Sequence, residues 1–230
     1  MIVLSCYKNI VFFTGAGISV ESGVPTYRGP GGTWSTYDFE EYACQEAFDR
    51  NPDKVLEFHE MRRAAVGLCL PNSAHYAIAK LQATRPGVNI ITQNIDGLHV
   101  MAGGKNVVEL HGSLWRSECR SCGLKFQVDE YTSRKCGCGS YLRPNITWFG
   151  DSLSLSALGK ARYLIDHCDL FISIGTSGQV FPAASLPARA KMHGAITVEV
   201  NIEDTMMSNE FDMKLRGKSS DLIPQIVGIL

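Results

Sequence analysis

Short, unbroken runs of apolar residues recur along the chain, and glycine or small polar residues follow most of them. Runs of this kind cover residues 9–14, 88–92, 107–110, 169–174 and 195–200. Their length and their many valine and isoleucine residues are typical of parallel strands that are buried on both faces. Segments of mixed polarity separate the runs, so strands and helices alternate. We therefore expect an α/β fold with a doubly wound, Rossmann-like parallel sheet.

Four of the intervening segments have the pattern of helices. We expect helices over residues 46–66, 73–83, 155–167 and 221–229. Pro52 marks a helix start within the first segment. Asn72 is the expected N-cap of the second helix, and Ser219 or Ser220 that of the last, because short polar side chains accept hydrogen bonds from the free N–H groups at a helix start.

Two segments of different character interrupt the expected sheet. Residues 38–83 are predicted to form a helical module, and residues 113–143, in which cysteines lie among glycines and polar residues, a zinc-binding module. Residues 1–37, 84–112 and 144–230 then form the larger, Rossmann-like domain. The two inserted modules together make a smaller domain.

The composition excludes several classes of protein. Of the 230 residues 45% are hydrophobic, the formal net charge is -1, and there are eight cysteines. No basic field is present to attract nucleic acid or an anionic membrane, and no apolar run reaches the ~20 residues of a membrane-spanning helix. The opening MIVLSC is too short and lacks the charge of a signal peptide. We therefore expect a cytoplasmic protein with neither nucleic acid nor membrane as partner. We also expect a monomer, which the composition itself does not decide.

Polar side chains follow two of the expected strands at their carboxyl ends, where open α/β sheets bind ligands. Gln93, Asn94 and Asp96 follow one strand, and His111 follows the next. An imidazole is suited to general base catalysis near neutral pH, and amides and a carboxylate beside it would complete a site. Taken singly, the amides could begin a turn and the histidine could be a satisfied core residue.

The sequence GAGIS, residues 15–19, directly follows the first expected strand and indicates a phosphate-binding turn. Glycines let main-chain N–H groups approach a pyrophosphate, and the start of the next helix favours negative charge. Val20 stands where the dinucleotide fingerprint has its third glycine, and no strand presents Asp38 to a ribose. The motif therefore argues against a standard dehydrogenase.

Two further groups of residues lie outside the strand ends. The long loop after the glycine turn carries Tyr27, Arg28 and Trp34, and loops of this length inside compact domains are often functional. His59 and Arg62 are three positions apart on an expected helix and therefore share one face. Arg28 could equally be a solvent-exposed charge, and the helical pair could be part of an ordinary helix surface.

Four cysteines have the spacing of a zinc site. Cys119 and Cys122 are followed, after thirteen intervening residues, by Cys136 and Cys138. Two such knuckles suit tetrahedral Zn²⁺, and because no histidine or carboxylate belongs to the set, the metal is expected to be structural. A disulfide or redox pair is the competing interpretation, which an intracellular protein disfavours.

These motifs occur together and in the same order in the sirtuins, and the chain resembles that family over nearly its whole length. The matching segments are GAGIS with ESGVPTYRG, TQNIDGLH, ELHG, the cysteine knuckles, LRPNITWFGD, GTS at residues 175–177, and VEVN. Sirtuins are NAD-dependent protein-lysine deacylases. The resemblance therefore implies NAD as co-substrate, structural Zn²⁺, acylated lysine peptides or proteins as partners, and nicotinamide, free lysine and O-acyl-ADP-ribose as products.

The resemblance also implies roles for individual residues. His111, Asn94 and Gln93 would be catalytic, with His111 as the general base on a ribose hydroxyl. The implied NAD-binding residues are Gly15, Ala16, Gly17, Ser19, Tyr27, Arg28, Trp34, Gln93, Asn94, Asp96, Gly175, Thr176, Ser177, Asn201 and Ser219. The main chain around Phe149 and Val180 would bind the substrate peptide by strand addition.

His59 and Arg62 occupy positions where the desuccinylase and demalonylase branch of the family has a Tyr-x-x-Arg pair in its acyl pocket. Arg62 retains a guanidinium that can pair with a distal carboxylate, and His59 replaces the tyrosine. We expect removal of succinyl, malonyl and also acetyl groups, with more pH-sensitive activity than in a tyrosine enzyme. The alternatives are mainly deacetylase activity, an ADP-ribosyltransferase, a non-catalytic NAD or ADP-ribose sensor, and an interaction module built on the cysteines.

Overall fold

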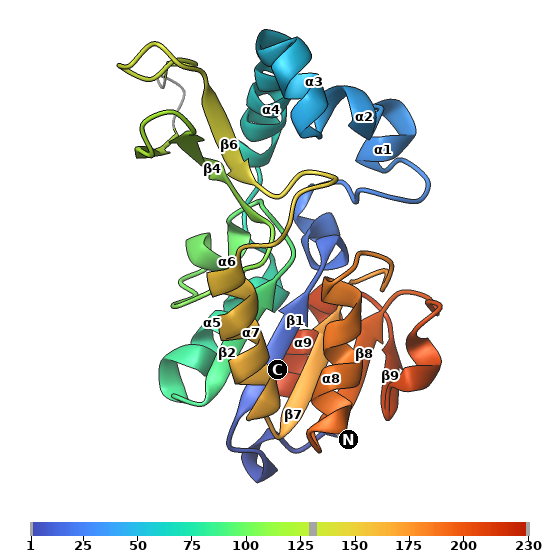
Figure 1. Ribbon diagram of the computed structural model, residues 1–230. Coiled ribbons are helices and arrows are strands. Elements are labelled where there is room, and N and C mark those ends of the chain that lie inside the picture. The colour runs from blue at the N-terminus through green and yellow to red at the C-terminus, as the bar shows by residue number, and fades with distance from the viewer. Residues whose placement is uncertain (1, 129–132, 229–230) are drawn as a thin grey trace.

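A computed structural model describes residues 2–128 and 133–228, and its centre is a sheet of six parallel strands (Figure 1). In spatial order the strands are β3 (Val108–Glu109), β2 (Val88–Thr92), β1 (Ile10–Thr14), β7 (Leu170–Ile174), β8 (Ile196–Asn201) and β9 (Met213–Arg216). All neighbouring pairs run parallel. The chain order reverses between β1 and β7, so the expected doubly wound, Rossmann-like sheet is confirmed.

Helices cover both faces of this sheet (Figure 1). One face carries α5 (Ser73–Thr84) and α9 (Ser219–Val227), and the other carries α7 (Leu155–Asp166) and α8 (Leu186–Met192). Neighbouring residues of a strand point to opposite faces, so Phe12 belongs to the first core and Phe13 to the second. Burial on both faces explains why continuous apolar runs marked the central strands in the sequence.

A smaller module lies beyond the carboxyl ends of the parallel strands (Figure 1). Its antiparallel sheet has the order β5 (Lys125–Gln127), β4 (Gly112–Cys119) and β6 (Leu142–Ile146). Its helices are α1 (Thr33–Thr36), α2 (Phe39–Tyr42), α3 (Gln45–Arg50) and α4 (Pro52–Gly67). Val55 of α4, Leu114 of β4 and Trp148 pack in one shared core. The inserted module is therefore built from both segments expected to interrupt the sheet.

Short helices complete the described chain. They are η1 (Leu4–Cys6), η2 (Ala16–Ser22), α6 (Leu98–Met101), η3 (Ala183–Ser185) and η4 (Ser208–Glu210). η2 directly follows β1, so the glycine turn leads into a 3-10 helix. Within the residues that the structure describes, no helix combines the length and apolar character needed to cross a membrane.

Several expected helix boundaries change in the structure. The segment over residues 46–66 contains two helices, because the Asn51 side chain caps a new helix and Pro52 occupies its first turn. The Asn72 cap of α5 is confirmed, since its side chain accepts from the Ala74 N–H. The predicted Ser219 or Ser220 cap of α9 is wrong: Lys218 holds that position without a side-chain bond. The predicted end at residue 229 lies outside the described residues.

Helix α5 bears on how the chain divides into modules. The expected division placed residues 38–83 in the helical module, but Ala74 and Ile78 of α5 pack in the core on one face of the parallel sheet, where α5 also contacts α9. This packing argues for ending the helical module at α4. The expected zinc-binding module, residues 113–143, corresponds to β4 through the start of β6, and its residues 129–132 lie outside the described part of the chain.

Candidate active site

A cavity of about 570 Å³ lies where the parallel sheet meets the smaller module. Its wall is formed by the glycine turn, the ends of the central strands, α4 and the segment after β6. The predicted site residues that line it are Gly15, Ala16, Gly17, Tyr27, Arg28, Trp34, His59, Arg62, Gln93, Asn94, His111, Phe149, Gly175, Thr176, Ser177, Val180, Asn201 and Ser219. A cavity of this size and mixed polarity suits a small-molecule or nucleotide ligand.

The glycine turn approaches the end of β7 more closely than any side chain would allow. A Cβ atom on Gly17 would lie 2.6 Å from Cα of Gly175, and one on Gly15 would lie 2.8 Å from the Gly175 carbonyl oxygen. The Gly17 N–H donates to that oxygen at 2.8 Å. Gly175 has a φ of 59°, which disfavours other residues. The glycines therefore shape the cavity wall at the topological switch point, where such sheets bind nucleotides.

Asn94, Ser19 and Asp96 form a buried network behind this turn. Asn94 Nδ2 donates to the Gly15 carbonyl at 3.1 Å and to Ser19 Oγ at 3.2 Å, and Ser19 Oγ donates to Asp96 Oδ2 at 2.8 Å. Burial raises the pKa of Asp96, which hydrogen bonds from the Leu98 N–H and Ser19 oppose. Asn94 lines the cavity, whereas Ser19 and Asp96 are absent from the wall that the described residues define. The network therefore holds Asn94 and the turn in place.

His111 lies at the cavity with one ring nitrogen engaged. Its Nδ1 lies 2.8 Å from the main-chain carbonyl oxygen of Gln93. A carbonyl oxygen can only accept, so Nδ1 carries the hydrogen and Nε2 is left as a base. Burial lowers the pKa of His111, and the bond to Gln93 partly opposes this. The ring is therefore neutral at physiological pH and can take up a proton at Nε2.

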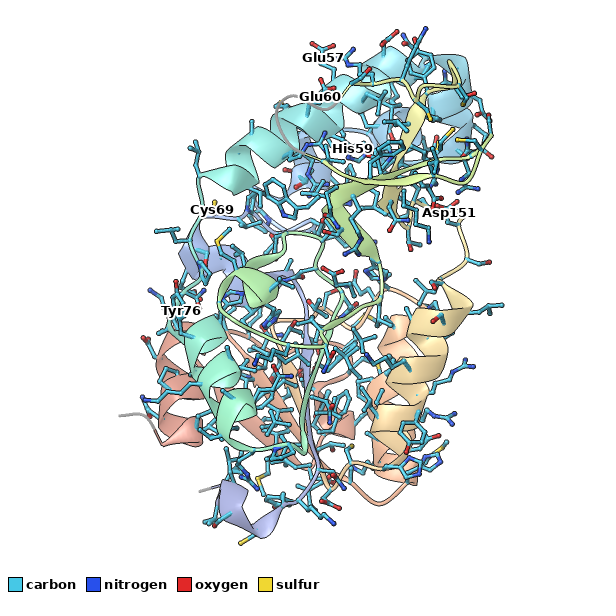
Figure 2. All side chains as sticks on the ribbon, turned by 90° about the vertical axis from the view of Figure 1, so that its left-hand side faces the viewer. Glu57, His59, Glu60, Cys69, Tyr76 and Asp151 are labelled. Carbon is cyan, nitrogen blue, oxygen red and sulfur yellow. The ribbon has the colours of Figure 1, made fainter. Side chains whose placement is uncertain are left out.

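The guanidinium group of Arg62 lines the cavity and has no carboxylate partner among the described residues. Its Nη2 donates to the Tyr27 hydroxyl at 2.9 Å, and the guanidinium carbon lies 5.0 Å from the Tyr27 ring centroid. Arg62 forms no ion pair within the described part of the chain. Figure 2 shows Glu57 and Glu60 on the outer side of α4 and His59 on the side that faces the strands. The side of α4 that carries Arg62 and His59 is therefore a cavity wall and not an ordinary surface.

His59 is 1% exposed and pairs with Trp148. Trp148 Nε1 donates to His59 Nε2 at 3.2 Å, and the two rings are 16° from parallel. Burial and then the positive charges of Arg62 and Arg63 hold the pKa of His59 well below its usual value. This environment disfavours a protonated His59 and so argues against the more pH-sensitive activity expected from a histidine at this position. His59 and Arg62 were predicted to line an acyl pocket; that role stays a prediction, and we use the name acyl pocket for these two residues together with Trp148.

At the opposite end of the cavity, polar side chains join the strand ends to the loops. Asn201 Nδ2 donates to the Thr176 carbonyl at 3.2 Å, and Ser219 Oγ donates to Glu21 Oε2 at 3.3 Å. Ser177 is exposed at the cavity edge. These residues lie where an adenosine group is predicted to bind, and that role stays a prediction.

Some main-chain groups of the segments expected to bind a peptide already form hydrogen bonds within the protein. The Phe149 N–H donates to the Ala43 carbonyl at 3.0 Å, and the Val180 carbonyl accepts from the Ala184 N–H at 2.8 Å. Both residues line the cavity. Strand addition stays a prediction, and it would have to use the other main-chain groups of these segments.

The four predicted zinc ligands come together away from the cavity. Their Sγ atoms all lie within 4.8 Å of one another, with Cys119 and Cys138 3.5 Å apart and Cys122 and Cys136 3.6 Å apart. Zn–S bonds of about 2.3 Å place the sulfur atoms of a tetrahedral site about 3.8 Å apart. The cluster is therefore compatible with structural zinc held by a ribbon, as the sequence predicted.

Several cavity residues were given no role in the sequence analysis. Ile95, Thr147 and Trp148 line the wall near α4, and Met206 lies at the opposite end. Trp148 was part of the LRPNITWFGD motif, but its contact with His59 depends on residues 89 positions apart. Such a contact follows from tertiary packing and has no local pattern.

Comparison with known proteins agrees with this geometry. The chain matches the Sir2 family over residues 15–182. It is similar to NAD-dependent protein deacylase 2 of Pyrobaculum aerophilum, with 43% identity over 229 residues that cover 98% of this chain and 92% of the relative. It is also similar to the NAD-dependent protein deacylase of Aquifex aeolicus, with 44% identity over 229 residues, 96% of this chain and 95% of the relative. A solved complex of a mutant Sir2 homologue with ADP-ribose has a TM-score of 0.91 and 39% identity, covering 96% of this chain and 91% of that one.

Proposed function

Since this chain belongs to the Sir2 family and is an NAD-dependent protein deacylase, we propose that it removes succinyl and malonyl groups from lysine side chains as well as acetyl groups. The observation that supports this preference is Arg62, whose guanidinium lines the cavity and has no carboxylate partner among the described residues. A guanidinium presents parallel N–H groups that match a carboxylate. Succinyl and malonyl chains end in a carboxylate, whereas an acetyl group does not.

In the proposed reaction, His111 acts as the general base. The acyl oxygen of the modified lysine would displace nicotinamide from the ribose. The Gln93 carbonyl holds the Nδ1 hydrogen of His111, so Nε2 is the atom that would accept a proton from a ribose hydroxyl as this hydroxyl attacks the resulting imidate, and water would then release free lysine. Asn94 also lines the cavity, and we assign it the role of orienting the nicotinamide end. The products are nicotinamide, free lysine and O-acyl-ADP-ribose. A base at this position also argues against an ADP-ribosyltransferase.

The acyl preference is tested by an Arg62→Met variant assayed on matched succinyl-lysine and acetyl-lysine peptides. A hydrogen bond to a charged group contributes about 1.5–3 kcal/mol, so kcat/KM on the succinyl peptide should fall about 10- to 100-fold. The acetyl peptide should change by no more than about twofold, because it makes no charged contact. Equal losses on the two peptides would remove the carboxylate role and leave a deacetylase.

Arg63→Met is the matched control for charge. Arg63 is on the same helix, but its Nη1 donates to the Leu114 carbonyl at 2.8 Å and it does not belong to the described cavity wall. Its loss should affect both peptides equally. Nicotinamide release that depends on added acyl-lysine peptide, measured in the same series, separates a deacylase from a non-catalytic NAD or ADP-ribose sensor.

A further inference from the structure

Trp148 is held in one orientation against His59. Its side chain is 3% exposed. Its main-chain N–H donates to Asp151 Oδ2 at 3.0 Å, and the guanidinium carbon of Arg143 lies 3.8 Å from its ring centroid. The ring N–H is then directed at His59 Nε2, 3.2 Å away. Contacts at the main chain, the ring face and the ring edge therefore fix the indole.

The hydrogen bond between the two rings determines where His59 carries its hydrogen. An indole N–H can only donate, so His59 Nε2 must accept and must be without hydrogen. The hydrogen of the neutral ring then lies on Nδ1, which has no hydrogen-bond partner among the described residues. A second proton on Nε2 would break the bond and bring two N–H groups into opposition.

We propose that Trp148 is a positioning residue that holds His59 as the neutral Nδ1–H tautomer, so that His59 adds no positive charge beside Arg62. Recognition of an acyl carboxylate in the acyl pocket then depends on Arg62, and the selectivity between charged and neutral acyl groups does not vary with pH near neutrality. The statement on selectivity rests on the proposed function, whereas the tautomer does not.

The groups around His59 disfavour its protonated form, as the indole N–H does. Burial is the first cause of the lowered pKa of His59, followed by Arg62 and Arg63 on the same helix and by Arg143 on β6. The main-chain carbonyl of Tyr42 opposes them; it comes near the ring without the geometry of a hydrogen bond, so Nδ1 remains unpartnered among the described residues. A protonated His59 would therefore be repelled by three guanidinium groups, of which that of Arg143 is paired with Asp151, and would also oppose the N–H of the indole.

The tautomer can be read from the ring nitrogen resonances of the full-length, zinc-loaded protein labelled with ¹⁵N. A His59→Gln variant assigns the His59 signals among the six histidines. We expect an unprotonated Nε2 and a protonated Nδ1 that stay unchanged from about pH 6 to about pH 8. A protonated Nε2, or a ring that titrates in this interval, would overturn the proposal in the wild-type protein itself.

A Trp148→Phe variant removes the donor and keeps an aromatic ring. His59 should then shift towards the Nε2–H form or begin to titrate, because Nε2 no longer accepts the indole hydrogen. Trp115→Phe is the matched control, since Trp115 Nε1 donates to the Asp96 carbonyl at 2.7 Å and that variant also loses an indole hydrogen bond. Unchanged His59 signals in Trp148→Phe, or equal changes in both variants, would contradict the proposed role.

The kinetic readout is the ratio of kcat/KM for succinyl and acetyl peptides, in which the titration of His111 cancels. In the wild type this ratio should stay within about twofold between about pH 6 and about pH 8. In Trp148→Phe it should rise about threefold at the lower pH, because a protonated His59 adds charge beside Arg62. The rise should vanish in the Trp148→Phe/His59→Gln double variant.

The outcomes separate this proposal from the acyl preference on which its kinetic part rests. A pH dependence that persists in the double variant would show that Trp148 does not act through His59. If Arg62→Met lowers both peptides equally, the proposed acyl preference fails, and the ring resonances still decide the tautomer.

Discussion

His75 should make this protein sensitive to acid, and the structure allows the size of the effect to be worked out. The side chain of this α5 residue is fully buried, with its ring centroid 4.9 Å from that of His99 in α6, and burial lowers its pKa to about 4. Its Nδ1 accepts from the Asn72 N–H at 3.3 Å, and its Nε2 lies 3.5 Å from Ser19 Oγ. These contacts suit a neutral ring.

The sign of the effect follows from proton binding in the two states. In the unfolded chain the pKa of a histidine is about 6.5, so between this value and the folded pKa of about 4 the unfolded chain binds more protons than the folded one. The free energy of unfolding therefore falls as pH falls. The stability from His75 is fully present above about pH 6.5, and about 2 kcal/mol of it is lost between about pH 8 and about pH 5.

The assay is urea unfolding of the wild type and a His75→Gln variant, followed by tryptophan fluorescence at about pH 8 and about pH 5. Glutamine can still accept from the Asn72 N–H but does not titrate, so the pH-dependent loss of unfolding free energy should be about 2 kcal/mol smaller in the variant. The exposed His167 at the end of α7, changed to glutamine, is the control and should leave this loss unchanged. Comparison of the variants at each pH cancels any contribution from zinc release.

The reasoning would be refuted if His75→Gln lost as much stability as the wild type between these pH values. That result would mean that the folded protein protonates His75 without cost. Burial would then not be the dominant influence on this ring.

Two further predictions concern the catalytic base and the metal. His111→Gln should lower kcat at least about 100-fold, because it removes the proton acceptor. NAD affinity, measured by calorimetry, should change by less than about threefold. Retained turnover, or a loss of NAD binding that accounts for the lower activity, would contradict the assigned role. Chelation of zinc should unfold the zinc ribbon of β4, β5 and β6, since four free thiols within 4.8 Å of one another do not replace the metal bonds. A metal-sensitive dye measures how much zinc is released, and circular dichroism follows the unfolding. An unchanged circular dichroism spectrum after complete zinc release would show that the metal is not structural.

The central strands could be predicted from sequence because residues buried on both faces of a sheet form continuous apolar runs. β9 was missed for the converse reason: it is an edge strand with exposed or partly exposed residues, and its Lys214 and Arg216 interrupt the apolar pattern. α8 was missed because it is short and begins with Pro187 in its first turn. The apolar pattern of a segment therefore indicates how deeply that segment is buried, and exposed elements at the edge of the sheet show too weak a pattern to be predicted.

The location of the candidate site could be predicted from the sequence, but the contacts of its side chains could not. The strand ends and the glycine turn placed Gly17, Asn94 and His111 at one cavity, because the carboxyl ends of parallel strands meet at one edge. The surroundings of each side chain could not be predicted. The sequence offered His59 as a group that could be protonated, whereas its pairing with Trp148 and its burial depend on how α4 packs against the segment after β6.

The path of the chain between the two modules has a consequence for engineering. It leaves the parallel sheet after η2, returns before α5, leaves again after β3 and returns before α7. Three of these four connecting segments contribute residues to the cavity, among them Tyr27, His111 and Phe149. Neither module is a continuous stretch of sequence, so the cavity wall as a whole cannot be transferred from a relative as one fragment, and a chimaera would have to match the chain at each of these crossings.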